Sequence, residues 1–424
     1  MSSQHDSKVL ETTVLISSGV GRLHFIEIAK LLEDQGRHFE LICGFIPDPK
    51  FNKFLFWIGP LLGRPNLPKR LSMRLGDCDS LLPYLRSNAL AEGVTQLLLR
   101  LADLHLVPRG RTQTWAWRFF GWRSRRYMRD QTVFHVRSGA GQGGAISTAR
   151  RLGMRIIVDQ SIAHPAYIAR WLVPEYEKVG ADFEGRPENP FWSLVLEDCR
   201  DADLLVVNSE FVKRTFVAEG FDPARIRVLY WGVREDFIGL KTDYNIKGRV
   251  KLLFTGNLEL RKGLRILVEA LEALRDQMFD FELHVAGSDL EARRFYGDRL
   301  SRLPVIWHGS LVQDDLKRLL AESDIYVFPT FAEGCARSAM EALFAGLPVV
   351  TTEACGLPGE PGLQFCEVPV GDSLALASAV QAISANFSVR SSLGLEAKYF
   401  ASNGKYSWSK FGDELYDIYR ECWK

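Results

Sequence analysis

Short apolar runs alternate with amphipathic stretches along most of the chain. Near the start, apolar runs at residues 13–16 and 39–43 flank an amphipathic stretch at 25–32, which Gly36 closes. A short apolar run predicts a buried strand, and apolar residues spaced by three and four predict a helix. The order strand, helix, strand predicts a parallel βαβ unit.

The same alternation resumes after residue 131. It predicts strands at residues 133–136, 156–159, 204–207, 226–229, 251–254, 282–286, 305–307, 325–328 and 349–352. It predicts helices at 146–151, 210–219, 264–275, 314–321 and 336–344, and a closing amphipathic helix from Trp408 to Cys422. Turn residues at 237–247 predict a linker. Two α/β units joined by a linker predict two Rossmann-like, doubly wound domains facing a central cleft.

Composition narrows the class of protein. The 424 residues are 46% hydrophobic and 25% charged, which is typical of a soluble globular protein. The sequence contains no run of 18 apolar residues, so we expect no membrane-spanning helix. The first residues do not resemble a secretory signal. Seven cysteines without a C-x-x-C pair favour neither a disulfide framework nor a zinc site. We therefore expect a cytoplasmic protein without a bound metal.

The segment 51–129 differs in charge from the rest of the chain. It holds 14 basic and four acidic residues, so its net charge is +10, although the whole chain has +1. Within residues 109–129, seven arginines are interleaved with Trp115, Trp117, Phe119, Phe120, Trp122 and Tyr127. Arginine with aromatics suits an anionic membrane surface or nucleic acid. A solvated basic face with aromatics in the core is the third interpretation, and nucleic acid is the least expected.

A glycine-rich loop follows the first predicted strand. Residues 17–21, Ser-Ser-Gly-Val-Gly, suit a loop that approaches a ligand, but His24 stands where the dinucleotide-binding fingerprint requires a third glycine. The second strand also lacks an acidic residue at its end. A dinucleotide-dependent oxidoreductase is therefore the weaker alternative. His164 lies between a predicted strand and a helix, where either a structural or a functional role is open.

The stretch 324–352 carries a second candidate site. A strand, a loop with Glu333 and Gly334, a helix and another strand follow in order. We expect the backbone N–H groups of Gly334, Cys335 and Ala336 to be open donors at a helix N-terminus, which suits a phosphate. Glu333 and Glu341 are eight residues apart, or roughly 12 Å along a helix. They could therefore hold two ends of one hydroxyl-rich ligand.

An earlier loop adds cations to this site. Gly256 and Gly263 bracket Arg261 and Lys262 after the strand at 251–254. Two adjacent cations at a strand end can neutralise a diphosphate. Cations for phosphate together with carboxylates for hydroxyls describe a sugar nucleotide.

These motifs resemble a known family. The order G-N-L-x-x-R-K-G, H-V-A-G-S, H-G-S and Y-V-F-P-T-x-x-E-G-x-x-x-S-x-M-E-A-L-x-x-G-x-P-V-V over residues 251–352 is similar to the donor domain of the retaining glycosyltransferases of family 4, which have the GT-B fold. The resemblance implies an acceptor-binding domain at 1–238, a nucleotide-sugar domain at 239–404 and a final segment, 405–424, that packs back on the first domain.

The resemblance also implies roles for single residues. Arg261 and Lys262 would hold the donor diphosphate, with Gly21, Gly256 and Asn257 near the phosphates. Glu333 would bind the donor sugar, and Glu341 the ribose. Gly334, Cys335 and Ala336 would offer backbone N–H groups, and His164 would face the transferred sugar. Asn257 is a departure, because many relatives carry arginine at this position.

The resemblance implies a hexosyltransferase that retains the anomeric configuration and uses a nucleotide-diphosphate sugar without a metal or a permanently bound cofactor. Its acceptor would be a glycan, a lipid-linked sugar or another hydroxyl compound, as in polysaccharide biosynthesis. The basic segment at 109–129 would place the cytoplasmic protein at the inner face of a membrane. A dinucleotide-dependent oxidoreductase and a membrane or nucleic-acid binding module remain the alternatives.

Overall fold

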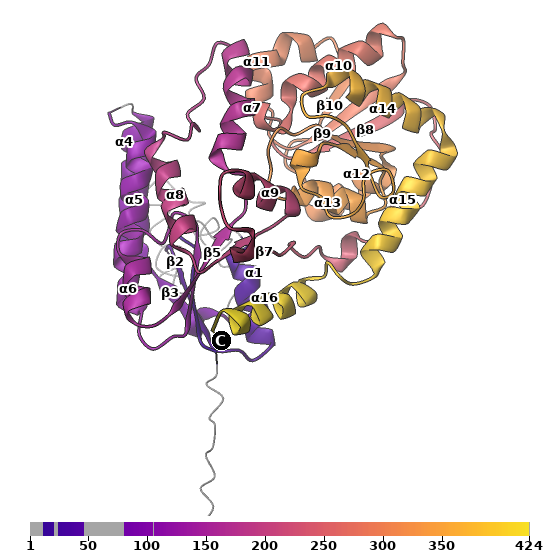
Figure 1. The fold of residues 1–424 in the computed structure, drawn as a ribbon. Coiled ribbons are helices and arrows are strands. Elements are labelled where there is room, and N and C mark those ends of the chain that lie inside the picture. The colour runs from indigo at the N-terminus through magenta and orange to yellow at the C-terminus, as the bar shows by residue number, and fades with distance from the viewer. Residues whose placement is uncertain (1–11, 21–23, 46–79, 105, 424) are drawn as a thin grey trace, which may run out of the picture. The chain divides into compact units, whose positions relative to one another are not determined.

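The computed structural model describes residues 12–20, 24–45, 80–104 and 106–423 (Figure 1). The chain forms two compact units. The first comprises Met1–Gln160, Glu188–Leu205 and Glu414–Lys424, and the second comprises Ser161–Pro187 and Val206–Asp413. The chain passes between the units several times, and the domain boundary near residue 238 stays a prediction.

The first sheet has seven strands in the order β3-β2-β1-β4-β5-β6-β7. These are β1 (Val14–Ser17), β2 (Phe39–Cys43), β3 (Leu85–Ser87), β4 (Val133–Arg137), β5 (Arg155–Gln160), β6 (Leu204–Val207) and β7 (Ile226–Val228). β1 pairs in parallel with β2 and β4, and Ile16 lies opposite both Leu41 and His135. All four residues of β1 are buried, as expected for a central parallel strand covered on both faces.

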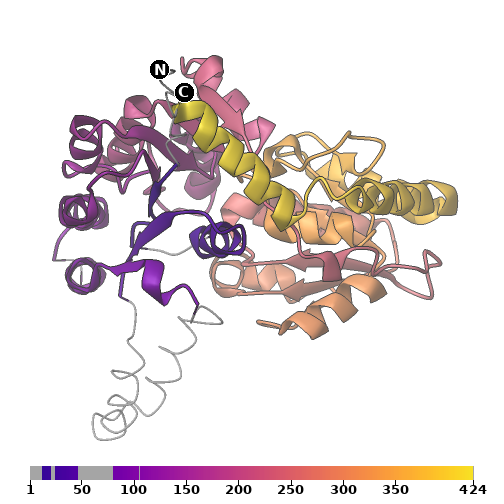
Figure 2. The same cartoon turned by 90° about the horizontal axis from the view of Figure 1, so that it is seen from below.

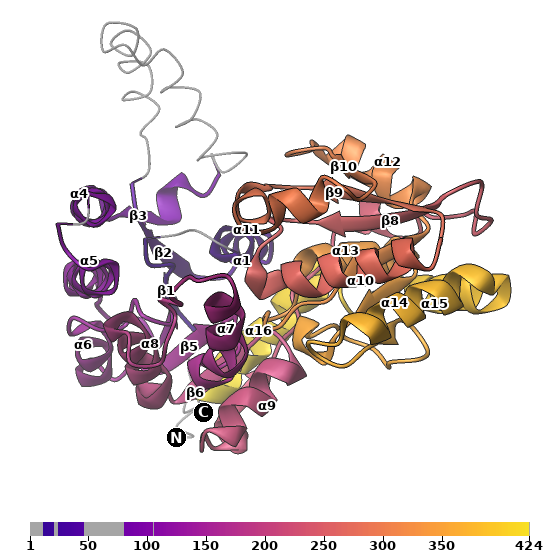
Figure 3. The same ribbon diagram turned by 90° about the horizontal axis from the view of Figure 1, so that it is seen from above.

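Helices cover both faces of the strands in the first unit. These are α1 (Phe25–Asp34), α4 (Ala89–Asp103), α5 (Arg109–Ser124), α6 (Ala145–Arg151) and α8 (Pro190–Asp201). Figure 3 shows α4, α5, α6 and α8 on one side of β1 and β2, and α1 on the other. α4 and α5 were not predicted, because their exposed faces carry apolar and aromatic residues that hide the helical period.

The last helix, α16 (Trp408–Trp423), is the long yellow helix beside the C label in Figure 2. Its second half belongs to the first unit. There the Tyr419 hydroxyl lies 2.7 Å from Nδ1 of His135, and the Arg37 guanidinium lies 3.8 Å from the centre of the Tyr416 ring. The predicted closing amphipathic helix is confirmed.

The second sheet has six strands in the order β10-β9-β8-β11-β12-β13. They are β8 (Val250–Thr255), β9 (Phe281–Ala286), β10 (Val305–Trp307), β11 (Ile325–Phe328), β12 (Val349–Thr351) and β13 (Cys366–Glu367), and all five pairings are parallel. The carboxyl ends of parallel strands lie at one edge of a sheet, so the loops after β8, β9 and β11 are neighbours.

The helices of the second unit are α7 (Pro165–Lys178), α9 (Glu210–Ala218), α10 (Leu264–Asp276), α11 (Leu290–Leu300), α12 (Gln313–Glu322), α13 (Arg337–Phe344), α14 (Ser373–Ala385) and α15 (Phe387–Ser402). α10 packs against α11 and α14, and α13 packs against α15. Two parallel sheets with covering helices confirm the predicted α/β fold of two Rossmann-like domains.

Candidate donor site

The candidate site begins where β8 ends. Gly256 has a φ of +114°, and its N–H donates to the carbonyl of Ala286 on β9 at 2.8 Å. A Cβ atom at this position would lie only 2.8 Å from Nζ of Lys262. Glycine therefore both adopts the left-handed backbone and leaves room for the ammonium group.

Arg261 lies in the 3-10 turn η5 (Leu260–Lys262) and is already bound within the protein. Its Nη1 lies 2.7 Å from Oε1 of Glu333 and donates to the carbonyl of Ala332, also at 2.7 Å. Burial disfavours the charged guanidinium, but Glu333 and Glu259 more than offset this and hold the pKa of Arg261 above its ordinary value. The structure thus brings Arg261 and Glu333 together, although the sequence suggested separate partners for them.

Lys262 is placed differently from its neighbour. Its Nζ lies 5.7 Å from the centre of the Phe328 ring and beside Gly256. Among the described residues, no carboxylate forms an ion pair with Lys262. Lys262 is therefore the cation of this loop that is available to an anionic ligand.

The loop of Glu333 rests on the turn η6 (Glu353–Cys355). The N–H of Glu333 donates to the carbonyl of Ala354 at 2.9 Å, and the N–H of Ala336 donates to that of Cys355 at 3.1 Å. The expectation of an open donor at Ala336 therefore does not hold, because η6 takes that donor. Within the described part of the chain, the N–H groups of Gly334 and Cys335 have no acceptor. Two of the three expected donors are open.

Gly334 is fixed from the other side by the start of α9. The Ser209 hydroxyl donates to the carbonyl of Gly334, and it also accepts the N–H of Val212 as the cap of α9. A Cβ at Gly334 would collide with the carbonyl oxygen of Ser161 and with the amide of Asn208. No local sequence motif could have shown the contact of Asn208 and Ser209 with the Glu333 loop, because it depends on the tertiary fold.

Glu341 lies on α13, two turns beyond Gly334. Its side chain is largely buried, and the nearest cation is Nε of Arg337 at 3.4 Å. Burial raises the pKa of Glu341, and Arg337 and Arg234 only partly offset this. A largely buried carboxylate is stabilised by hydrogen bonds from hydroxyl groups, and the hydroxyl groups of a ribose can donate such bonds.

Of the other predicted site residues, His164 and Asn257 lie in the described part of the chain. His164 has an exposed fraction of 5%, and its Nδ1 accepts the N–H of Ala166 as the cap of α7. Its ring meets Phe216 edge-on at 5.0 Å, which is the environment of a structural histidine. Asn257 is exposed, and its amide donates to Glu259 at 3.2 Å. Gly21 lies outside the described residues.

Several supporting residues were missed from the sequence. One oxygen of Glu291 accepts the N–H of Leu260 at 2.7 Å, and the other lies 3.0 Å from the Tyr176 hydroxyl. Arg265 donates to both oxygens of the buried Glu175, at 2.6 and 2.8 Å. These interactions fix η5 between α7 and α11, and no local motif could have shown them.

Two kinds of feature are absent from the described residues. They contain no group of three or more His, Cys, Asp or Glu side chains that could hold a metal ion. None of the described helices has the length and the apolar character that crossing a membrane requires.

A family of known proteins matches this part of the chain. The family described as Glycosyl transferases group 1 matches residues 249–386, which include Lys262, Glu333 and Glu341. The match covers the six strands of the second sheet. The finer assignment to family 4 stays a resemblance.

Curated relatives agree with the family match. The amylovoran biosynthesis glycosyltransferase AmsK of Erwinia amylovora is 30% identical over 189 residues, which are 42% of this chain and 46% of that protein. The sulfoquinovosyl transferase SQD2 of Arabidopsis thaliana is 24% identical over 229 residues, which are 51% of this chain and 41% of that protein. The matched regions thus span about half the length of these relatives.

Solved structures match over nearly the whole chain. HepE of Anabaena in complex with UDP has a TM-score of 0.63 at 16% identity and covers 97% of this chain and 100% of that chain. The sucrose-phosphate synthase of Thermosynechococcus elongatus has a TM-score of 0.63 at 16% identity, with 96% of this chain and 98% of that chain covered. At such identities the likeness shows the fold, which is the two-domain GT-B fold.

Proposed function

We propose that this chain, whose residues 249–386 match the family described as Glycosyl transferases group 1, transfers a hexose from a nucleotide-diphosphate sugar to a hydroxyl group of a glycan or a lipid-linked sugar. The observation that carries the proposal is the arrangement around Lys262. An unpaired ammonium group and the two open N–H groups of Gly334 and Cys335, all among the described residues, lie on neighbouring loops with carboxylates beside them. Relatives named for glycosyl transfer, and a structural neighbour that holds UDP, support the same interpretation.

The residues divide between binding and reaction. Lys262 neutralises the diphosphate, and the N–H groups of Gly334 and Cys335 stabilise the charge that develops when the sugar leaves. Arg261 holds Glu333 in position to accept hydroxyl groups of the donor sugar, and Glu341 binds the ribose. In this proposal Lys262 and the two N–H groups supply this stabilisation without a metal ion.

The reaction retains the anomeric configuration in this proposal. The leaving phosphate takes the proton of the acceptor hydroxyl on the face from which it departs, so no side chain acts as general base. His164 is then a structural cap. Residues 1–238 with 405–424 provide the acceptor domain, and 239–404 provide the donor domain. The comparisons give the oxidoreductase alternative no support.

A donor screen tests the proposal. The full chain is incubated with UDP-glucose, UDP-galactose, GDP-mannose, ADP-glucose and dTDP-rhamnose, and both slow hydrolysis and thermal protection are measured. At least one donor should respond, and Lys262→Ala or Glu341→Ala should abolish the response. The surface variants Lys247→Ala and Glu322→Ala are the matched controls. Folded protein that responds to no donor would refute the proposal. NMR of the released sugar and added EDTA then test retention and metal independence.

We also propose that helix α5 docks on an anionic membrane surface, where lipid-linked acceptors reside. The exposed side of α5 alternates between arginine and tryptophan at four- and three-residue spacing, in the order Arg111, Trp115, Arg118, Trp122 and Arg125. The exposed fractions are 53% for Trp115 and 51% for Trp122. These two aromatics are therefore not core residues, which removes the main objection to a membrane role.

The neighbouring helix also exposes apolar side chains. α4 packs along α5, and its exposed leucines recur every seven residues, as Leu90, Leu97 and Leu104. A seven-residue spacing keeps side chains on one side of a helix. Indole and leucine side chains enter the interface while guanidinium groups meet lipid phosphates.

Flotation with vesicles tests the docking surface. Each arginine near an anionic surface contributes about 1 kcal/mol, so replacing Arg111, Arg118 and Arg125 by Gln should lower partitioning roughly a hundredfold. Phosphatidylglycerol vesicles should bind the wild type, and phosphatidylcholine vesicles should bind it weakly. Arg151→Gln with Arg155→Gln is the control. Equal binding of the triple variant would refute this surface, and retention on nucleic acid instead would support the other interpretation.

A further inference from the structure

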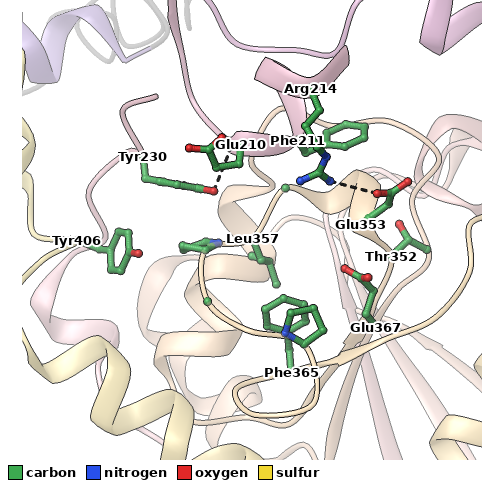
Figure 4. Close-up of a pocket in the computed structure, with 14 residues that line it drawn as sticks. Glu210, Phe211, Arg214, Tyr230, Thr352, Glu353, Leu357, Phe365, Glu367 and Tyr406 are labelled. Atoms are coloured by element: carbon green, nitrogen blue, oxygen red, sulfur yellow. Dashed lines mark hydrogen bonds and ion pairs between the residues drawn. The ribbon is translucent and has the colours of Figure 1, made fainter. Parts of the chain in front are cut away.

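A cavity of about 270 Å³ lies in the second unit, outside the proposed donor site. It is bounded by the start of α9, by the loop that follows β12 and by Tyr406 (Figure 4). Sites for small molecules measure roughly 300–1,000 Å³, so this side cavity suits a ligand of one ring.

The inner part of the side cavity is aromatic. Phe211, Phe365 and Tyr406 are buried, and Tyr230 is half-buried. The rings of Tyr230 and Tyr406 meet edge-on, with centroids 5.8 Å apart and an interplanar angle of 88°. Their faces and edges offer an apolar surface, which suits a ring that has C–H groups on one side.

The mouth of the side cavity is polar and charged. Glu210, Glu353 and Glu367 line it with one cation, Arg214, which lies 3.1 Å from Glu353. Figure 4 shows this pair opposite the Glu210 and Tyr230 side chains. Burial raises the pKa of Glu367, and the Glu353 charge adds to the effect. Three carboxylates and one guanidinium carry a net charge of −2 when ionised.

The charges at the mouth of the side cavity exclude anionic ligands and favour a neutral polyol. A phosphate or a nucleotide would be repelled by the net charge of −2. An ammonium group would be attracted by the carboxylates, but it offers no acceptor to the Arg214 guanidinium. Hydroxyl groups donate to carboxylates and accept from guanidinium, so a neutral polyol satisfies both kinds of group at once. A saccharide ring combines such hydroxyl groups with apolar C–H faces.

We propose that the side cavity binds one neutral saccharide unit of the acceptor or product glycan, at a position separate from the transferred sugar. This inference rests on the proposed glycosyl transfer for the identity of the glycan. The wall of the cavity is continuous with the donor site, because Glu353 and Gly356 flank the carbonyls of Ala354 and Cys355 that hold the Glu333 loop. An occupied cavity therefore braces the loop that holds the donor.

Saturation-transfer NMR tests the proposal with methyl α-glucoside, methyl α-galactoside, methyl α-rhamnoside and maltotriose as probes. Ethanolamine and inorganic phosphate are the charged probes. At least one saccharide should give signals with the full chain. Leu357→Trp, which fills the cavity, and Glu367→Gln, which removes an acceptor, should each reduce them at least fivefold. Glu322→Gln, an exposed acid on α12, should leave them unchanged.

Three outcomes would overturn the proposal: no saccharide signal, signals that persist in both variants, or signals from ethanolamine or phosphate alone. Thermal melting of each variant verifies that it is folded. Titration of the same samples with UDP, GDP, ADP and dTDP separates the two proposals. If nucleotides bind but no saccharide does, only the side-cavity proposal is refuted. If no nucleotide binds to the wild type, the proposed donor site is refuted.

Discussion

Lys262 and Arg261 are adjacent, yet the structure predicts different consequences for their removal. Lys262 has no carboxylate partner among the described residues, whereas Arg261 joins Glu333 and the carbonyl of Ala332. Lys262→Ala should therefore weaken binding of a nucleoside diphosphate and leave stability unchanged. Arg261→Ala should reduce stability first.

The magnitudes follow from the interactions that each side chain makes. A hydrogen bond to a charged group contributes about 1.5–3 kcal/mol, so Lys262→Ala should raise the Kd roughly 10- to 150-fold. The side chains of Arg261 and Glu333 are 25% and 16% exposed. Without Arg261 the mostly covered Glu333 has no cation beside it, which should lower the free energy of unfolding by about 1–3 kcal/mol.

Isothermal titration with UDP, GDP, ADP and dTDP measures the first effect, and thermal melting measures the second. Arg261→Lys is the control, because it keeps the charge and removes the fork that reaches two acceptors. The reasoning is wrong if Arg261→Ala melts like the wild type while losing as much nucleotide affinity as Lys262→Ala. In that case the guanidinium would be as free as the ammonium group.

Three further predictions concern the scaffold. Burial lowers the pKa of His135 to about 4, below its value in the unfolded chain. The contribution of His135 to the free energy of unfolding is therefore fully present above pH 6.5, and that free energy should fall by about 3 kcal/mol as the pH drops to 4. Urea unfolding of the wild type and of His135→Gln across this pH range measures the effect. Gly334→Ala should lower the free energy of unfolding by about 1–3 kcal/mol, because the added Cβ clashes with the backbone. Gly297→Ala is the control, since a Cβ there meets nothing within 4 Å, and it should be near neutral in the same urea assay. Arg265→Met leaves buried Glu175 with Lys178 as its remaining cation and should cost about 1.5–3 kcal/mol in thermal unfolding, and a similar Tm to wild type would contradict this.

The strands were the most predictable part of the fold. β2, β6 and β11 begin and end where their apolar runs do, because buried parallel strands carry apolar residues on both faces. The edge strand β10 also matches its apolar run, although its residues are half-buried or exposed. α11 was not predicted, since it carries charged residues over much of its surface and bends at Tyr296. Helix boundaries shifted by one residue at α13, where Ala336 became the cap.

The site was predictable as a set of loops but not as a set of interactions. Glycines and cations after β8, and the acidic pair after β11, are local features that the sequence displays. That Arg261 is bound by Glu333, and that η6 takes the N–H of Ala336, depends on which loops the sheet order makes neighbours. Residues such as Glu291 have no local signal, because their partners lie in distant segments.

The three tryptophans of α5 lie in two different environments, which quenching of tryptophan fluorescence can distinguish. Trp115 and Trp122 face outward, whereas Trp117 lies against Gly19 and Gly139, with the Arg137 guanidinium 5.0 Å from its ring centre. Iodide or brominated lipid should therefore quench the outer two indoles and spare the inner one. The chain has ten tryptophans, so a protein that keeps one of these three and carries Phe at the other nine positions would report either the surface or the glycine loops, without any added dye.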